Sequence, residues 1–138
     1  MIPHIKRVSD KVKPPKTGYS MGCVITLKKG HENEEGLIAH ELTHVKQWWR
    51  IVALFAACFT GIYFLAPEYF IASTAFTPFG LMAHNVLYRI RAYRKYAEVE
   101  AFKEHIKHGR DFENAAYNLH KHYDLDITLE EARKLLRG

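Results

Sequence analysis

The sequence predicts a mainly helical domain with a small β element, an α+β fold, and three observations lead to this expectation. Stretches with helical periodicity fill most of the chain from Leu37 onward. A short run rich in β-branched residues, Val24–Leu27, is bounded by Gly22 and Gly30, as a strand would be. The 138 residues suffice for one hydrophobic core and leave no room for a second. We therefore expect residues 1–138 to form a single domain.

The N-terminal residues 1–18 are basic and are expected to form an extended arm, because prolines interrupt them at Pro3, Pro14 and Pro15. The strand predicted over Met21–Leu27 needs a partner, and we expect it near Val8 or Tyr19, giving a short N-terminal strand pair. An edge strand of this kind can bind an extended peptide by strand addition, or it can simply cover a neighbouring helix.

The next predicted helix carries the most informative pattern, His40-Glu41-Leu42-Thr43-His44. The helix is expected to begin between Glu32 and Glu35 with Asn33 as its N-cap. Residues four apart lie on one helix face, so His40 and His44 can direct their imidazoles at one metal ion. Glu41 lies beside that face, where a carboxylate can act on a metal-bound water. This spacing is the helix signature of zinc peptidases. The alternative is a surface helix on which the three side chains are merely solvated.

Residues 51–88 are expected to form an apolar helical insert or hairpin. Two uncharged runs, Ile51–Ala66 and Tyr69–Leu87, flank Pro67 and Glu68, and each approaches the length of a membrane span. Basic residues stand at both ends, Arg50 before the first run and Arg89, Arg91, Arg94 and Lys95 after the second. This arrangement is typical of a membrane hairpin with both ends on the inner side. The alternative is a pair of helices buried in a soluble domain or packed on a protein partner, which polar residues in the second run favour.

Three further helices are predicted after this insert. Tyr88–His108 forms a long charged helix that Gly109 ends. Residues 110–138 are expected to build and close the core with a helix over Asp111–Tyr123 and a short terminal helix through Leu136. A capping box from Thr128 to Glu131 opens the terminal helix. His120 and His122 are two residues apart and are expected on the surface.

Composition excludes several classes of protein. The formal charge is +5, but the basic residues are scattered and follow no nucleic-acid motif, so no nucleic-acid partner is expected. Cys23 and Cys58 are far apart and are expected to be free thiols. The first residues lack the apolar run of a secretory signal. We therefore expect a cytoplasmic or virion-associated protein, or one associated with a membrane through residues 51–88.

A catalytic zinc site usually has three protein ligands and one position for water. The segment Ala97-Glu98-Val99-Glu100-Ala101-Phe102 resembles that of the gluzincin peptidases, whose third ligand is a glutamate on a downstream helix. In that group a small residue follows the ligand at the third position, as Ala101 follows Glu98, whereas Lys103 follows Glu100. The resemblance implies Glu98 as the third ligand, with Glu100 as the alternative. Phe102 stands where an aspartate often braces the first histidine, so another group must orient His40.

The chain also resembles short H-E-x-x-H proteins often found in phages and prophages, over most of residues 19–138. The shared segments are His40–Trp48, Glu98–Phe102 and Leu125–Ala132, while the region around residues 51–88 is longer and more apolar than in that group. The resemblance implies a minigluzincin-like arrangement, in which the H-E-x-x-H helix packs on the glutamate-bearing helix.

These features predict a zinc metallopeptidase, a hydrolase of peptide or protein substrates, with Zn²⁺ held by His40, His44 and Glu98. Glu41 is its expected general base. The donors near the ligand helix that are candidates for stabilising the oxyanion are Tyr93, Tyr96, His105 and His108. Two alternatives stay open. One is a non-catalytic, zinc-containing structural or virion-assembly protein, and the other is a membrane-associated metalloprotease with residues 51–88 as its hairpin.

Overall fold

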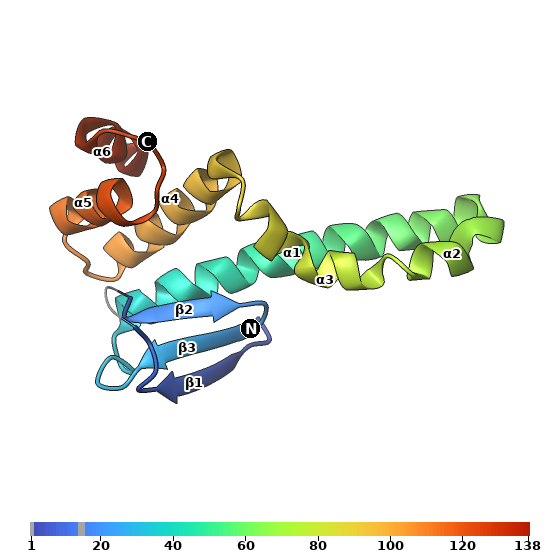
Figure 1. The fold of residues 1–138 in the computed structure, drawn as a ribbon, viewed down its shortest axis with the longest axis horizontal. Helices are drawn as coiled ribbons and strands as arrows, with labels where there is room; N and C mark the ends of the chain where they lie inside the picture. The colour runs from blue at the N-terminus through green and yellow to red at the C-terminus, as the bar shows by residue number, and fades with distance from the viewer. Residues whose placement is uncertain (1, 14–15) are drawn as a thin grey trace.

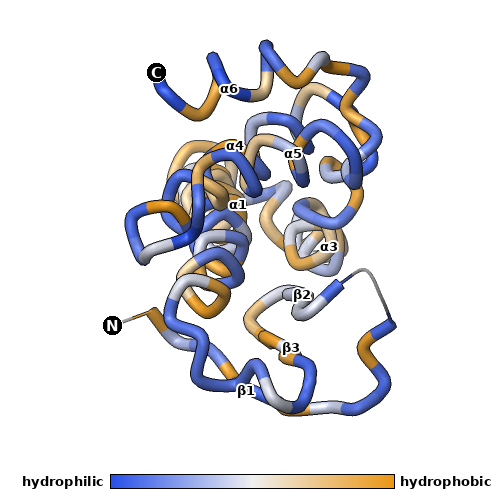
Figure 2. Tube along the Cα trace, turned by 90° about the vertical axis from the view of Figure 1, so that its left-hand side faces the viewer, coloured by the Kyte–Doolittle hydropathy of each residue, from blue (hydrophilic) through white to orange (hydrophobic). Residues whose placement is uncertain are grey.

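The computed structural model describes residues 2–13 and 16–138, so Pro14 and Pro15 of the predicted arm lie outside the described residues. The predicted α+β class is confirmed, because the chain is mainly helical and carries one small sheet. The sheet lies on one side of the first helix, and the C-terminal helices lie on the other side (Figures 1 and 2). The second half of the first helix extends away from both (Figure 1).

The sheet has three strands, β1 (Ile5–Ser9), β2 (Gly18–Met21) and β3 (Val24–Lys28), in the order β1-β3-β2. β1 pairs with β3 in parallel and β2 pairs with β3 in antiparallel fashion. Both predicted partner regions therefore form strands, where the sequence predicted one pair. The single strand predicted over Met21–Leu27 is wrong at its start, because Gly22 at φ 61° turns the chain between β2 and β3.

Helix α1 (Glu35–Leu65) runs without a break for 31 residues. Its N-cap is Glu34 in extended conformation, so the predicted cap at Asn33 is wrong by one residue. The first apolar run of the predicted insert is thus the second half of the same helix that carries the histidines. No proline or glycine lies near Arg50 to end the helix, and Pro67 follows its end.

After α1 the chain turns and runs back beside it. A short 3₁₀ turn, η1 (Pro67–Tyr69), leads into α2 (Phe70–Thr74) and α3 (Thr77–Leu87). Gly80 lets α3 approach α1, since a Cβ there would lie 3.0 Å from Cγ of Phe55. The indole nitrogen of Trp48 donates to the carbonyl of Leu81 over 2.8 Å. Residues 51–88 therefore form a helical hairpin that projects from the domain (Figure 1).

Burial of this hairpin inside the chain, one of the three sequence expectations, is wrong. Its exposed large apolar side chains belong to Leu54, Tyr63, Phe64, Leu65, Tyr69, Ile71, Phe76, Phe79, Leu81, Met82 and Val86. Within the described part of the chain, α1 is long and apolar enough to cross a membrane, judged by length and composition. Only 6% of its apolar 18-residue stretch is buried, unlike the core helix of a soluble protein.

Helix α4 (Arg91–Lys107) begins three residues later than predicted, because Tyr88 lies in the turn before it. Gly109 ends it at φ 93°, as expected. Helix α5 (Phe112–His122) is capped by Asp111, and α6 (Leu129–Arg137) opens with the predicted capping box of Thr128 and Glu131. The local end signals of these helices are therefore correct.

Two hydrophobic cores flank the first half of α1, so the prediction of one core is wrong. One lies between the sheet and α1 and contains Ile25, Leu27, Leu37 and Val45. The other joins α4, α5 and α6 through Phe102, Ala115, Ala116, Leu119, Leu125, Ala132 and Leu136. On α4, Ala97 and Ala101 are fully buried, so their small side chains allow α4 to pack closely on α1. The metal-ligand candidates lie where these two helices meet.

Candidate metal centre

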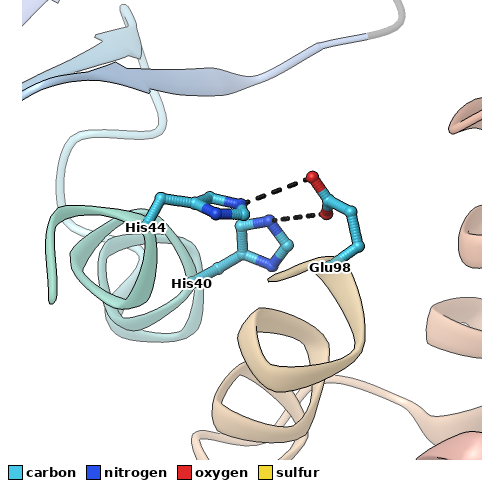
Figure 3. Close-up of side chains that lie close together, drawn as sticks. All are labelled: His40, His44 and Glu98. Atoms are coloured by element: carbon cyan, nitrogen blue, oxygen red, sulfur yellow. Dashed lines mark ion pairs between the residues drawn. The ribbon is translucent and has the colours of Figure 1, made fainter. Parts of the chain in front are cut away.

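Three side chains converge at the contact between α1 and α4 (Figure 3). His40 and His44 project from α1 toward the carboxylate of Glu98 on α4. Nε2 of His40 lies 3.5 Å from Oε2 of Glu98, and Nε2 of His44 lies 3.4 Å from Oε1. The three residues are 5%, 7% and 1% exposed, so the alternative of a solvated surface helix is wrong.

These spacings suit a small divalent cation. Ligand atoms at about 2.0–2.2 Å from a tetrahedral zinc ion lie about 3.3–3.6 Å from one another, and each histidine nitrogen lies at such a distance from one of the two carboxylate oxygens of Glu98. Two imidazole nitrogens and one carboxylate oxygen form a donor set that zinc commonly takes. Oε2 of Glu98 is buried without a hydrogen-bond partner among the described residues, and a bound cation would satisfy it. The residues present therefore fit Zn²⁺.

The protonation states of the metal-free cluster differ between its members. Burial, with smaller contributions from His44, His105 and Arg110, holds the pKa of His40 well below its ordinary value, so this imidazole is neutral and able to bind metal. Burial raises the pKa of Glu98 to about 8. Without a metal ion this carboxyl therefore retains a proton near neutral pH, and binding a cation releases it.

Gln47 holds His44 in the orientation that a ligand needs. Its amide nitrogen donates to the carbonyl of Ala97 over 3.0 Å and to Oε2 of Glu100 over 2.9 Å, so its amide oxygen is an acceptor. That oxygen lies 3.0 Å from Nδ1 of His44, which therefore carries the proton and leaves Nε2 free. Sequence analysis missed Gln47, although its place one helical turn after His44 was a usable signal.

Glu100, the alternative third ligand, does not join the cluster. Its carboxylate accepts from Gln47 and from Arg50, the latter over 2.8 Å. Successive residues on a helix point about 100° apart, so Glu98 and Glu100 face different neighbours. Glu100 therefore supports His44 through Gln47.

His40 is held by aromatic packing in place of the missing aspartate. The ring of Phe102 meets the His40 ring edge-on with centroids 4.7 Å apart, and the ring of His105 lies 5.6 Å away. Nδ1 of His40 makes no hydrogen bond within the described residues, although the nearby carbonyl of Ala101 raises its pKa slightly. Gly36 leaves room for His105, since a Cβ there would lie 2.6 Å from its ring.

Glu41 lies beside the cluster and is 4% exposed. Burial raises its pKa to about 7, while His44 acts in the opposite direction and Glu98, when it is ionised, adds to the increase. A carboxyl with this pKa both accepts and returns a proton near neutral pH. Strand β2 covers it closely, because a Cβ on Gly18 would lie 3.3 Å from Oε1 of Glu41.

The cluster opens into a cavity of about 710 Å³. Its wall includes the three ligand candidates and Glu41, residues 18–20 of β2, and Arg94 and Arg110. This volume lies within the range of pockets that bind small molecules or short peptide segments. The open cavity gives an external molecule access to the cluster.

One of the four predicted oxyanion donors lies on the wall of this cavity. His105 lines the cavity. Tyr93 instead contacts Nδ1 of His84 over 2.8 Å, Tyr96 is exposed and accepts from Arg50, and His108 is exposed and bonds to the Glu104 carbonyl. Within the described part of the chain, Tyr93, Tyr96 and His108 do not line the cavity.

Tyr88 is a second residue that sequence analysis missed. Its hydroxyl donates to Oε1 of Glu98, and its ring centroid lies 6.0 Å from that of His44. Tyr88 reaches the cluster because α3 returns along α1, a long-range packing that no local pattern indicates. The predicted surface positions of His120 and His122 agree with their exposure.

Comparisons with models of protein families, with curated proteins and with solved structures found no match to this chain. The chemistry assigned to the cluster therefore rests on the residues themselves.

Proposed function

We propose that the chain is a zinc-dependent hydrolase of peptide bonds, with His40, His44 and Glu98 as metal ligands and Glu41 as general base. The observation that carries this proposal is the position of Glu41 beside a three-ligand cluster on the wall of a large cavity. Structural zinc sites are closed by four protein ligands, whereas catalytic sites keep one position open. Among the described residues the cluster has three members, which favours catalysis over a purely structural role.

Zinc in such a site lowers the pKa of a bound water to about 7 and polarises a substrate carbonyl. Glu41 takes the proton of the attacking water as its oxygen bonds to the carbonyl carbon. Glu41 then passes that proton to the leaving nitrogen as the carbon–nitrogen bond breaks, which yields a carboxylic acid and an amine. Its pKa of about 7 suits both transfers.

One donor in the cavity is a candidate for stabilising the substrate carbonyl. His105 lines the cavity, and burial lowers its pKa to about 4, so its ring is neutral near pH 7. The hydroxyl of Tyr88 is already engaged, because it donates to the carboxylate of Glu98. Removing one oxyanion donor from a hydrolase typically lowers kcat about 10²- to 10³-fold.

Strand β2 supports a peptide as the substrate. It is an edge strand, and its residues Gly18, Tyr19 and Ser20 line the cavity beside Glu41. An extended peptide that pairs with this edge would run past the cluster, with its backbone carbonyls near the metal ligands. An arrangement of this kind selects for extended backbone and leaves side-chain preference to the cavity wall.

The deciding experiment measures zinc content and cleavage of a broad peptide library for the wild type and for Glu41→Gln. We expect both proteins to hold one equivalent of zinc and only the wild type to cleave. Glu98→Ala should lose zinc, and Glu100→Ala should retain it, since Glu100 touches the cluster only through Gln47. A wild type without stoichiometric zinc would refute the proposal.

A further inference from the structure

We propose that residues 51–80 insert into a lipid bilayer as a helical hairpin, with both ends on one side and Glu68 at the opposite headgroup layer. The domain with the metal cluster then lies on the surface of that bilayer. This inference concerns the hairpin alone and does not depend on the zinc chemistry.

The hairpin is apolar on all its faces. Exposed large side chains project from α1 at Leu54 and Phe64, from the tip at Ile71, and from α3 at Phe79. A helix pair that docks on one protein partner keeps a charged face toward water, whereas a pair surrounded by lipid does not. Glu68 at the tip is the single acidic or basic residue between positions 51 and 80. Lipid therefore suits this surface better than a second copy or another protein does.

Every serine and threonine hydroxyl of residues 51–80 donates a hydrogen bond to a backbone carbonyl three or four residues earlier. Thr60 donates to the carbonyl four residues earlier over 2.9 Å, and Ser73, Thr74 and Thr77 donate to carbonyls three residues earlier over 2.6–2.7 Å. In hydrocarbon, where water offers no partner, polar groups must be satisfied internally in this way. Three of these side chains are on exposed residues, where water would otherwise compete for them.

The length of the hairpin approaches the thickness of a bilayer. The helix from Ile51 to Leu65 rises about 22 Å, and the turn at Pro67–Tyr69 follows its end. The hydrocarbon core of a bilayer is about 30 Å thick. Exposed Tyr63 and Tyr69 lie at the tip, a depth at which aromatic residues accumulate in membrane proteins.

Basic residues gather at the base of the hairpin, where a cytoplasmic leaflet would attract them. Arg50 precedes the first arm, and Arg89 and Arg91 follow the second. Arg50 is paired with Glu100 and Arg91 with Asp126. The attraction to the leaflet therefore depends mainly on Arg89. An apolar groove of about 450 Å³ also separates the two arms, lined by Leu54, Cys58 and Phe76 among others. An acyl chain can fill such a groove, whereas water gains no hydrogen bonds there.

The natural cysteines provide the test, because Cys58 lies midway along the inserted arm and is exposed in the absence of lipid. Three single-cysteine proteins are made from the full chain. The first is Cys23→Ala, which keeps Cys58. The other two carry Cys23→Ala and Cys58→Ala together with either Glu68→Cys or Lys134→Cys, both at exposed positions. Each is added to preformed, sealed vesicles of phosphatidylcholine and phosphatidylglycerol and treated with a membrane-impermeant maleimide.

We expect Lys134→Cys to react at once and Cys58 to lose its labelling when vesicles are present. Glu68→Cys should react only after a pore-forming toxin opens the vesicles. Equal labelling of all three proteins would overturn the proposal, as would labelling of Glu68→Cys from outside sealed vesicles. Protection of Cys58 without vesicles, in a protein of dimeric mass, would assign the hairpin to a second copy and overturn it as well.

Discussion

The amide oxygen of Gln47 lies 3.0 Å from Nδ1 of His44, while the amide nitrogen of the same side chain donates hydrogen bonds to two acceptors on α4. A buried glutamine thus fixes the tautomer of one ligand and ties the two ligand-bearing helices together. His40 is instead packed against the rings of Phe102 and His105. The two histidines of one motif are therefore supported by different kinds of contact.

Replacement of Gln47 by methionine keeps the volume of the side chain and removes its hydrogen bonds. Loss of such an outer contact to a ligand typically weakens metal binding about 10- to 100-fold. We expect a decrease of that size in zinc affinity, measured by competition with a chelator. Glu100→Gln is the matched control, because its amide oxygen can still accept from Gln47. An unchanged affinity in Gln47→Met would show that His44 needs no such support.

The stability of the metal-free protein should fall between about pH 6.5 and pH 8. Burial raises the pKa of Glu41 to about 7 and that of Glu98 to about 8 from an ordinary value of 4.5. The folded protein therefore keeps protons that the unfolded chain has lost, and its free energy of unfolding decreases as pH rises. The lowered pKa values of His40, His84 and His105 give the opposite slope, which fades as pH rises above their ordinary value of 6.5. Thermal unfolding in the presence of a chelator measures this dependence.

Zinc should reverse this pH dependence, because it binds the deprotonated carboxylate of Glu98 and releases its proton. The increase in melting temperature on adding zinc should therefore be larger at pH 8 than at pH 6.5. Glu41→Gln removes one of the two raised pKa values and should flatten the metal-free curve. A metal-free wild type that gains stability over this pH range would contradict the assignment.

Gly18→Ala should lower cleavage without releasing zinc. The added methyl would lie 3.0 Å from Cδ2 of Leu27 and 3.3 Å from Oε1 of Glu41, so the general base must shift. A barrier increase of about 1.4 kcal/mol corresponds to a tenfold loss of kcat/KM, and we expect a loss of at least about that size. Gly61→Ala is the matched control, since a Cβ there meets no atom within 4 Å. Equal activity in both variants would place Glu41 away from the chemistry.

A charge in the middle of the hairpin should prevent its insertion. Ala57 is exposed and lies near the centre of the apolar arm, so Ala57→Arg removes no packing in the folded chain. An arginine at the centre of a bilayer costs about 2.5–3.5 kcal/mol, which corresponds to a decrease in vesicle partitioning of about 100-fold. Ala57→Leu, with a larger apolar side chain at the same position, should bind vesicles at least as well as the wild type. Flotation of both proteins with vesicles checks the prediction.

The site was predictable where its signals were local. The spacing of His40, Glu41 and His44 follows from helix periodicity, and the resemblance to the gluzincin peptidases pointed to Glu98 through the small residue Ala101. The end signals of the last three helices, including Gly109 and the capping box at Thr128, were also correct. Each of these features depends on residues within one or two turns of one another.

The features that were missed depend on contacts between distant segments. A strand was predicted near Val8 or Tyr19, but the pairing of both regions with β3 was not, because β1 is almost wholly exposed and shows no alternation of buried and exposed residues. Tyr88 reaches Glu98 only because the hairpin folds back along α1. The continuity of α1 was hidden by the change from charged to apolar composition at Arg50, although composition alone does not end a helix.

The unbroken α1 joins the metal cluster and the hairpin in one rigid rod. His44 and Ile51 are seven residues apart on it, a rise of about 10 Å. On the two proposals above, this rod sets the height at which a chain emerging from the bilayer meets the cluster. The fixed length of α1 would then select cleavage sites by their distance from the lipid surface as much as by their sequence.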